Sequence, residues 1–213
     1  MTTQTHISWP DGARWRAFLK FMGLFYLFFF PVYFGAGHIA AQSHDTFGLY
    51  WSWEREIPLV PWMIWPYLTL FSLFLLPLFH MSAGQISSLS RQSTAALVIA
   101  GVVFLLVPTH LGFPPITVED LHQPLFGLLA TVDIPHNLAP SLHVAFSALI
   151  LLGCAAQTSP YLAWGYRSWL LLLSISTVLV HQHHIVDVLS GLVLALIMQR
   201  LFPFDSPLRS SRR

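Results

Sequence analysis

The sequence predicts an all-α protein, a polytopic membrane bundle of six transmembrane helices. Hydrophobic residues make up 55% of its 213 residues and charged residues only 9%, whereas a soluble domain carries about 25% charged residues. Six apolar runs approach the roughly 20 helical residues that a bilayer requires. The fourth run is barely long enough and the last two are closely linked, so five crossings is the alternative count. The runs lie near 17–37, 58–79, 94–112, 139–157, 161–181 and 185–202.

Lysine and arginine residues favour an even number of crossings. With six crossings, nine of them fall on one side of the membrane and Arg55 falls alone on the other. Because positive loops stay in the cytoplasm, we expect cytoplasmic termini and a multi-pass protein of the cell inner (plasma) membrane. The histidine-rich loops then lie on the periplasmic or outer face. The nine residues are Arg14, Arg16, Lys20, Arg91, Arg167, Arg200, Arg209, Arg212 and Arg213.

The chain is expected to form one membrane domain with two short flanks. Residues 1–16 are predicted to be a polar cytoplasmic flank, and residues 203–213 a basic cytoplasmic tail. Residues 17–202 would then carry the six helices, without a soluble domain or an internal repeat. The first run begins beyond residue 16, is long and lacks a small-residue cleavage site after it, so it is expected to be a retained anchor. It is rich in Phe and Tyr and has no polar stripe, which favours a lipid-facing role.

The middle of the chain contains two interruptions. Pro58, Pro61 and Pro66 open the second run and predict a broken or kinked helix there. A polar link is expected over residues 82–93, before the third run. The longest connection, residues 113–140, is more often functional than idle at such a length. Within it, residues 118–132 mix acidic and apolar side chains and predict an amphipathic helix on the membrane surface.

The fourth run begins with residues that are typical of a helix start. Asn137 is a good cap, and Pro140 is tolerated in a first turn, where its missing N–H costs nothing. The free N–H groups of such a start attract phosphate. Ser141 would add a hydroxyl donor and His143 would reach out from the first turns. Ordinary capping is the alternative interpretation of this pattern.

Three histidines and an aspartate separate the last two runs, in His181-Gln182-His183-His184-Ile185-Val186-Asp187. Ionisable groups at the end of a membrane segment are costly, which indicates a functional site. His183 and Asp187 are one helical turn apart, so the carboxylate can hold one imidazole nitrogen. The other nitrogen is then free to act as a nucleophile or a base. The alternative is a histidine cluster that binds metal or lines a polar cavity.

Two of these segments resemble motifs of one enzyme superfamily. The second and third motifs of the type 2 phosphatidic acid phosphatase superfamily resemble Pro140-Ser141-Leu142-His143 and His183-His184-Ile185-Val186-Asp187. Membrane members of that superfamily have six helices, with these motifs at the outer ends of the later ones. The resemblance covers about residues 50–195 and implies a bundle of the same kind.

The surrounding residues are similar to one branch of that superfamily, the inositol phosphorylceramide synthase-like proteins. The similarity lies in Ile57-Pro58-Leu59-Val60-Pro61-Trp62, in Asn137 three residues before the Pro-Ser-Leu-His motif, and in Gln182 before the two histidines. The same segments resemble the membrane domain that some bacteria fuse to a dual-specificity phosphatase domain.

The resemblance implies an integral membrane lipid phosphatase or phosphotransferase that works without a metal or cofactor. Its substrate would be a phosphorylated lipid or a lipid phosphodiester, and its partners this lipid and the bilayer, without nucleic acid. His183 would be the nucleophile that forms a phosphohistidine, Asp187 would orient it, and His143 would be the acid and then the base. The candidate substrate-binding residues are Ser141, Asn137, His184 and His110.

Two features of the superfamily's phosphatases are missing. Their Ser-Arg pair ahead of the nucleophile is replaced by Ser176-Thr177, and their basic first motif by Pro108-Thr109-His110. Arginine forks usually bind doubly charged phosphomonoesters. A singly charged phosphodiester, as used by head-group transferases, therefore fits better, unless protonated histidines replace the missing cations.

Two other classes of protein stay open at this point. One is a haem or zinc membrane protein that uses His143 and the three histidines at 181–184. The absence of a His-Glu-x-x-His run argues against the common intramembrane protease. The other is a lipid transporter or scaffold that has kept a site without catalysis.

Overall fold

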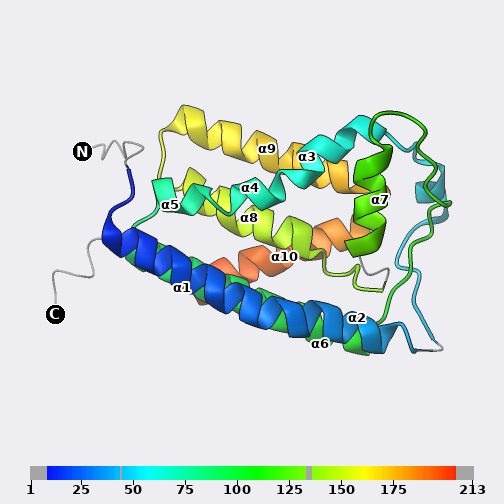
Figure 1. The fold of residues 1–213 in the computed structure, drawn as a ribbon, viewed down its shortest axis with the longest axis horizontal. Helices are drawn as coiled ribbons and strands as arrows, with labels where there is room; N and C mark the ends of the chain where they lie inside the picture. The colour runs from blue at the N-terminus through cyan, green and yellow to red at the C-terminus, as the bar shows by residue number, and fades with distance from the viewer. Residues whose placement is uncertain (1–8, 44, 133–135, 205–213) are drawn as a thin grey trace.

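The computed structural model describes residues 9–43, 45–132 and 136–204, and within these ranges the regular structure is helical (Figure 1). A single isolated parallel bridge joins Phe47 to Thr109. The predicted all-α class is therefore confirmed. Most of the expected tail, with Arg209, Arg212 and Arg213, lies outside the described residues.

The first apolar run forms a long helix with a wider turn inside it. Helix α1 (Gly12–Phe29) continues through a π-helical turn, η1 (Phe30–Phe34), into α2 (Gly35–Ala40). Pro31 lies in this turn and has no N–H to donate, which interrupts the regular α-helical pattern. The helix begins five residues before the expected run, so the end of the predicted polar flank is helical.

The second run is a helix in pieces, as its prolines indicate. A 3₁₀ turn, η3 (Pro61–Met63), leads into α3 (Ile64–Leu68), α4 (Leu70–Leu73) and α5 (Leu76–His80). At the first break the Thr69 hydroxyl donates to the carbonyl of Pro66 at 2.6 Å. These interruptions leave backbone groups available for contacts outside the helix.

The expected polar link before the third run is helical. Helix α6 (Ala83–Leu106) begins at Ser82, whose hydroxyl accepts the N–H of Gln85 while the Gln85 side chain accepts the N–H of Ser82. Gln92 is fully buried and donates to the carbonyl of Phe202 at 2.7 Å. The prediction was wrong because most polar side chains of this segment, Gln92 among them, are buried inside the bundle and not exposed to water.

The remaining helices complete the bundle around α8 (Leu142–Ala155), which is buried along most of its length. Helix α8 packs against α6, α9 (Pro160–Leu179) and α10 (Ile185–Leu201), while α1 and α2 lie along α6 (Figure 1). Helix α7 (Gln123–Val132) lies across one end of the bundle (Figure 1). It corresponds to the second part of the amphipathic segment expected over residues 118–132.

Three helices in the described chain are long and apolar enough to cross a membrane. They span residues 12–40, 83–106 and 160–179. The other three expected crossings correspond to the broken helix α3–α5, to α8 with 14 residues and to α10 with 17 residues. Apolar surface and helix length therefore agree with a membrane protein.

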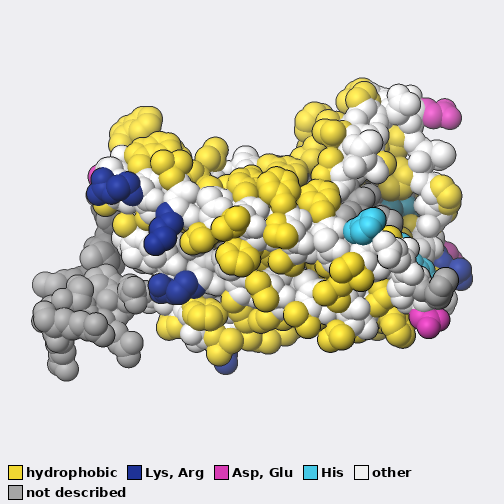
Figure 2. Space-filling model, turned by 60° about the horizontal axis from the view of Figure 1, so that its bottom comes forward, with side chains coloured by type: hydrophobic (Ala, Val, Ile, Leu, Met, Phe, Trp, Pro, Cys, Tyr) yellow, Lys and Arg dark blue, Asp and Glu magenta, His cyan; other side chains and the backbone are white. Residues whose placement is uncertain are grey.

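The two ends of the bundle differ in charge. We call the end that carries α7 the α7 end; it comprises the described residues of 45–63, 107–142 and 180–187. On the face shown in Figure 2, most Lys and Arg side chains gather at one end and the visible histidines at the other. Among the described Lys and Arg residues, Arg55 is the one whose position falls within the α7 end.

Gly191 allows α10 to approach the start of α8 closely. A Cβ atom at Gly191 would lie 2.5 Å from the backbone oxygen of Ser141. We expect Gly191→Ala to push the two helices apart and to lower the thermal unfolding temperature in detergent. Gly165→Ala in α9 is the matched control, because a Cβ there meets nothing within 4 Å. This variant should be at least as stable as the wild type, since alanine is more favourable than glycine in a helix by up to about 1 kcal/mol. Equal melting temperatures for the two variants would contradict this packing.

Candidate functional site

Main-chain hydrogen bonds join the loops at the α7 end into one layer. The N–H of Phe47 donates to the carbonyl of Pro108 at 2.8 Å, and the N–H of His110 donates back to the carbonyl of Phe47 at 3.1 Å. His136 Nδ1 lies 2.9 Å from the carbonyl oxygen of Thr109. Segments that are far apart in sequence are thus held together next to the helix starts.

Helix α9 ends in a left-handed turn at His181, which has φ of 58°. The N–H groups of Gln182 and His183 both donate to the carbonyl of Thr177, at 3.0 and 3.1 Å. A residue other than glycine is strained in this conformation by about 1–2 kcal/mol. The His181 ring is held by stacking on Phe113 at 4.1 Å and by a contact of 2.9 Å from Nε2 to the carbonyl of Ile57. This turn directs the chain from α9 to His183.

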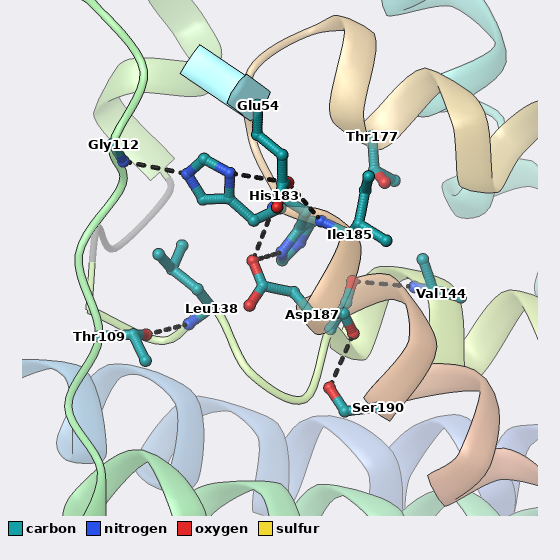
Figure 3. Close-up of polar contacts among 12 residues, drawn as sticks. Glu54, Thr109, Gly112, Leu138, Val144, Thr177, His183, Ile185, Asp187 and Ser190 are labelled. Carbon is teal, nitrogen blue, oxygen red and sulfur yellow. Dashed lines mark hydrogen bonds and ion pairs between the residues drawn. The ribbon is translucent and has the colours of Figure 1, made fainter. Parts of the chain in front are cut away.

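Asp187 caps α10 and connects it to α8. Its Oδ2 atom accepts the N–H of His184 at 2.8 Å, and its backbone carbonyl accepts the N–H of Ser141 at 3.0 Å. The Asp187 side chain is buried in the first turn of α10, where a negative charge is favourable. The starts of α8 and α10 therefore lie side by side (Figure 3).

His183 lies next to Asp187, but it precedes the cap of α10, so the two residues do not share a helical turn as their spacing predicted. Its Nδ1 atom is 3.5 Å from Asp187 Oδ2, close enough for an ion pair once the imidazole is protonated. The geometry is too long or too bent for a hydrogen bond, and Nδ1 is buried without another partner in the described part of the chain. Since Nδ1 faces the carboxylate, Nε2 is the nitrogen available for chemistry.

His143 is the second residue of α8 and is positioned by the broken second run. Its Nε2 lies 2.6 Å from the carbonyl oxygen of Tyr67, and its ring stacks on the Tyr67 ring at 3.9 Å. A carbonyl oxygen can only accept a hydrogen bond, so Nε2 carries a proton. His143 Nδ1 is therefore the nitrogen that can gain or lose a proton.

His143 and His183 line the same pocket, which has a volume of about 420 Å³. Its walls are mainly apolar and come from η1, α3, α4, α7 and α8, while Asn137 and Gln182 add polar groups. A largely apolar pocket with a few converging polar groups is typical of a small-molecule or lipid site. We call it the main pocket.

Ser141 and Asn137 differ from their expected places. The cap of α8 is Ser141, whose hydroxyl accepts the N–H of Val144 at 3.3 Å, and Asn137 lies outside the helix. Asn137 lines the main pocket but its amide nitrogen donates to the carbonyl of Tyr33 at 2.6 Å. Its buried Oδ1 has no hydrogen-bond partner among the described residues. The bond to Tyr33 uses one of the two amide N–H groups, so this side chain offers at most one donor to a phosphate.

His184 faces away from the main pocket and towards the loops. Its Nε2 accepts the N–H of Gly112 at 3.0 Å, so its proton lies on Nδ1, 3.2 Å from Glu54 Oε2. The ring also stacks on Tyr50 and Phe113. Burial lowers the pKa of His184. The ring is therefore neutral at neutral pH and does not replace a missing cation.

His110 also lies outside the main pocket. Its Nδ1 is 3.0 Å from the hydroxyl of Thr46, and its ring makes an edge contact with Tyr50. In this arrangement His110 joins the loops at the α7 end. Of the four candidate substrate-binding residues, the structure brings only Asn137 to the pocket wall.

Glu54 is a buried residue of this end that sequence reasoning missed. Its Oε2 accepts the N–H of Ile185 at 2.9 Å and faces His184 Nδ1, while Oε1 accepts the N–H of Trp51 at 3.0 Å. The side chain is fully buried, and Figure 3 shows it pointing towards the start of α10. In the sequence it stands two residues before the equally acidic Glu56, and no pattern indicates which of the two glutamates is buried. The positioning carbonyl of Tyr67 likewise has no sequence signal.

A metal site was the alternative use of the histidines. The described ranges contain no group of three or more His, Cys, Asp and Glu side chains that could hold a metal ion. No protein-family model, no curated protein and no solved structure matches this chain. The geometry around His143, His183 and Asp187 is therefore the observation that bears on function.

Replacing Glu54 by glutamine should loosen the start of α10. Three N–H donors face this carboxylate, and glutamine offers one oxygen and places an NH₂ group against a donor. We expect Glu54→Gln to lower the free energy of unfolding by about 2–4 kcal/mol. Glu56→Gln is the matched control, because Glu56 is exposed in the same 3₁₀ turn, η2 (Ser52–Glu56). Denaturation in detergent measures both, and an equally stable Glu54→Gln would refute the role of this carboxylate.

Proposed function

We propose that this protein is an integral membrane lipid phosphatase or head-group phosphotransferase that works through a phosphohistidine. The observation that carries the proposal is the shared pocket of His143 and His183, with the Asp187 carboxylate 3.5 Å from His183 Nδ1. An imidazole nucleophile, a carboxylate that stabilises its positive charge and a second imidazole for proton transfer suffice for phosphoryl transfer. The resemblance to the inositol phosphorylceramide synthase-like branch agrees with this assignment.

The first step transfers the phosphoryl group to the protein. His183 Nε2 attacks phosphorus and forms a P–N bond, while the bond from phosphorus to the leaving oxygen breaks. His143 Nδ1 gives its proton to that oxygen, and Asp187 stabilises the positive charge that develops on His183. The hydrogen bond from His143 Nε2 to the carbonyl of Tyr67 can persist in both protonation states and keeps the ring in place.

The second step releases the phosphoryl group. The oxygen of water or of an alcohol attacks phosphorus, and the electron pair of the P–N bond returns to His183. The proton of the attacking group passes to His143 Nδ1, which restores the starting state. Water yields a hydrolase, a phosphatase on a monoester or a phosphodiesterase on a diester, and an alcohol yields a transferase; all use the same residues.

A singly charged phosphodiester fits this end of the molecule better than a phosphomonoester. Among the described Lys and Arg residues only Arg55 belongs to the α7 end, and it is exposed and not part of the pocket wall. A phosphomonoester carries almost two charges near neutral pH and usually requires arginine partners. We infer that the substrate is a lipid phosphodiester whose apolar chains occupy the apolar part of the main pocket.

The proposed enzyme crosses the membrane six times, with α3–α5, α8 and α10 completing the set of crossings. The basic residues of the described helices then lie at the cytoplasmic end, and the α7 end lies at the outer face of the cell inner membrane. In this orientation α7, which lies across the end of the bundle, is parallel to the membrane surface.

Substrate turnover by purified variants tests this proposal. With phosphodiester and phosphomonoester lipids that share the same acyl chains, mass spectrometry should find faster turnover of the diesters. We expect no turnover by His183→Ala or Asp187→Asn, and a rate lowered about 10²–10⁴-fold by His143→Ala. His38→Ala, at an exposed histidine of α2, is the control and should turn over normally. Normal turnover by folded His183→Ala, or no product from any lipid, would overturn the proposal.

A further inference from the structure

A second pocket lies beside α7. Its volume is about 370 Å³, and it is lined by residues 116–119, by α7 residues from Gln123 to Ala130 and by Gln182. Thr117, Glu119, Gln123 and Gln182 give it a hydroxyl, a carboxylate and two amides, whereas the main pocket is mostly apolar. We call it the polar pocket.

The two pockets meet next to the proposed nucleophile. Ala130 and Gln182 are the residues that line both of them, and Gln182 directly precedes His183. The Gln182 side chain makes no hydrogen bond to any residue that the structure describes, although its main-chain N–H is bound to Thr177. Its amide can therefore donate to one group and accept from another at the boundary between the pockets.

We propose that the polar pocket binds a small polar alcohol group that carries no negative charge. The inference rests on the proposed function, since it places the apolar chains of the lipid in the main pocket and the alcohol across Gln182. Hydroxyl groups can both donate to the Glu119 carboxylate and accept from amide N–H groups. The same carboxylate repels an anionic group. The alcohol can be the head group of a phosphodiester lipid or a free acceptor.

Gly127 is a position in the polar pocket where a side chain can be added without a clash at its Cβ atom. It lines this pocket and not the main one, and a Cβ atom there would meet nothing within 4 Å. A leucine at this position would occupy space that the alcohol needs. Gly165→Leu in α9 adds the same side chain at another unobstructed position outside both pockets and serves as the control.

The test compares two phosphodiester lipids with identical acyl chains, one with a glycerol head group and one with a methyl head group. Gly127→Leu should lower the ratio of their kcat/KM values, glycerol over methyl, by about tenfold, and Glu119→Ala should lower it as well. Gly165→Leu should leave the ratio at the wild-type value. An unchanged ratio in Gly127→Leu, with turnover of both lipids intact, would show that the polar pocket does not bind the alcohol and would leave the proposed function standing.

A second arm separates the two sources of the alcohol. Free glycerol is added to the methyl-headed lipid, and new glycerol-headed product is measured by mass spectrometry. A yield that falls in Gly127→Leu supports a free acceptor in the pocket, while a changed head-group ratio without such product supports the lipid head group. If the wild-type protein turns over neither lipid, the proposed function fails and the inference fails with it.

Discussion

The arrangement of the α7 end depends on the buried carboxylate of Asp187. One oxygen accepts the N–H that opens α10, and the same oxygen lies 3.5 Å from His183 Nδ1. A buried charge is tolerated only where hydrogen bonds and opposite charge compensate its lost hydration. The N–H of His184 at the start of α10 helps to compensate the lost hydration of the Asp187 carboxylate. The same interaction that stabilises the helix start therefore also holds a negative charge beside the imidazole of His183, which the proposed reaction uses.

Irregular backbone supplies the other fixed contacts of the pocket. The π-helical turn in the first run presents the carbonyl of Tyr33 to Asn137, and the broken second run presents the carbonyl of Tyr67 to His143. In a membrane, backbone groups outside regular helices need partners within the protein. The interruptions of these two helices are thus connected to the orientation of two side chains in the pocket.

The sequence contained enough information for the helical class, for the break in the second run and for the pairing of His183 with Asp187. The first two follow from composition and from proline positions, whereas the contact of His183 with Asp187 is made by the turn before α10 and not by helical spacing. It did not reveal that residues 83–93 are helical, because buried polar side chains resemble a polar loop in a linear pattern. The direction of His184 and the burial of Glu54 also depend on contacts between residues about 130 positions apart, which no local pattern records.

The central claim is that His183 carries the phosphoryl group during turnover. The most direct test mixes the protein with a lipid phosphodiester labelled at phosphorus, stops the reaction rapidly and analyses the peptides by mass spectrometry. We expect an acid-labile, alkali-stable phosphorus adduct on one imidazole nitrogen of His183, found in the peptide that contains this residue. After substitution of His183 this peptide should carry no adduct. Turnover of the labelled lipid without any adduct on His183, or an adduct on another residue, would contradict the account.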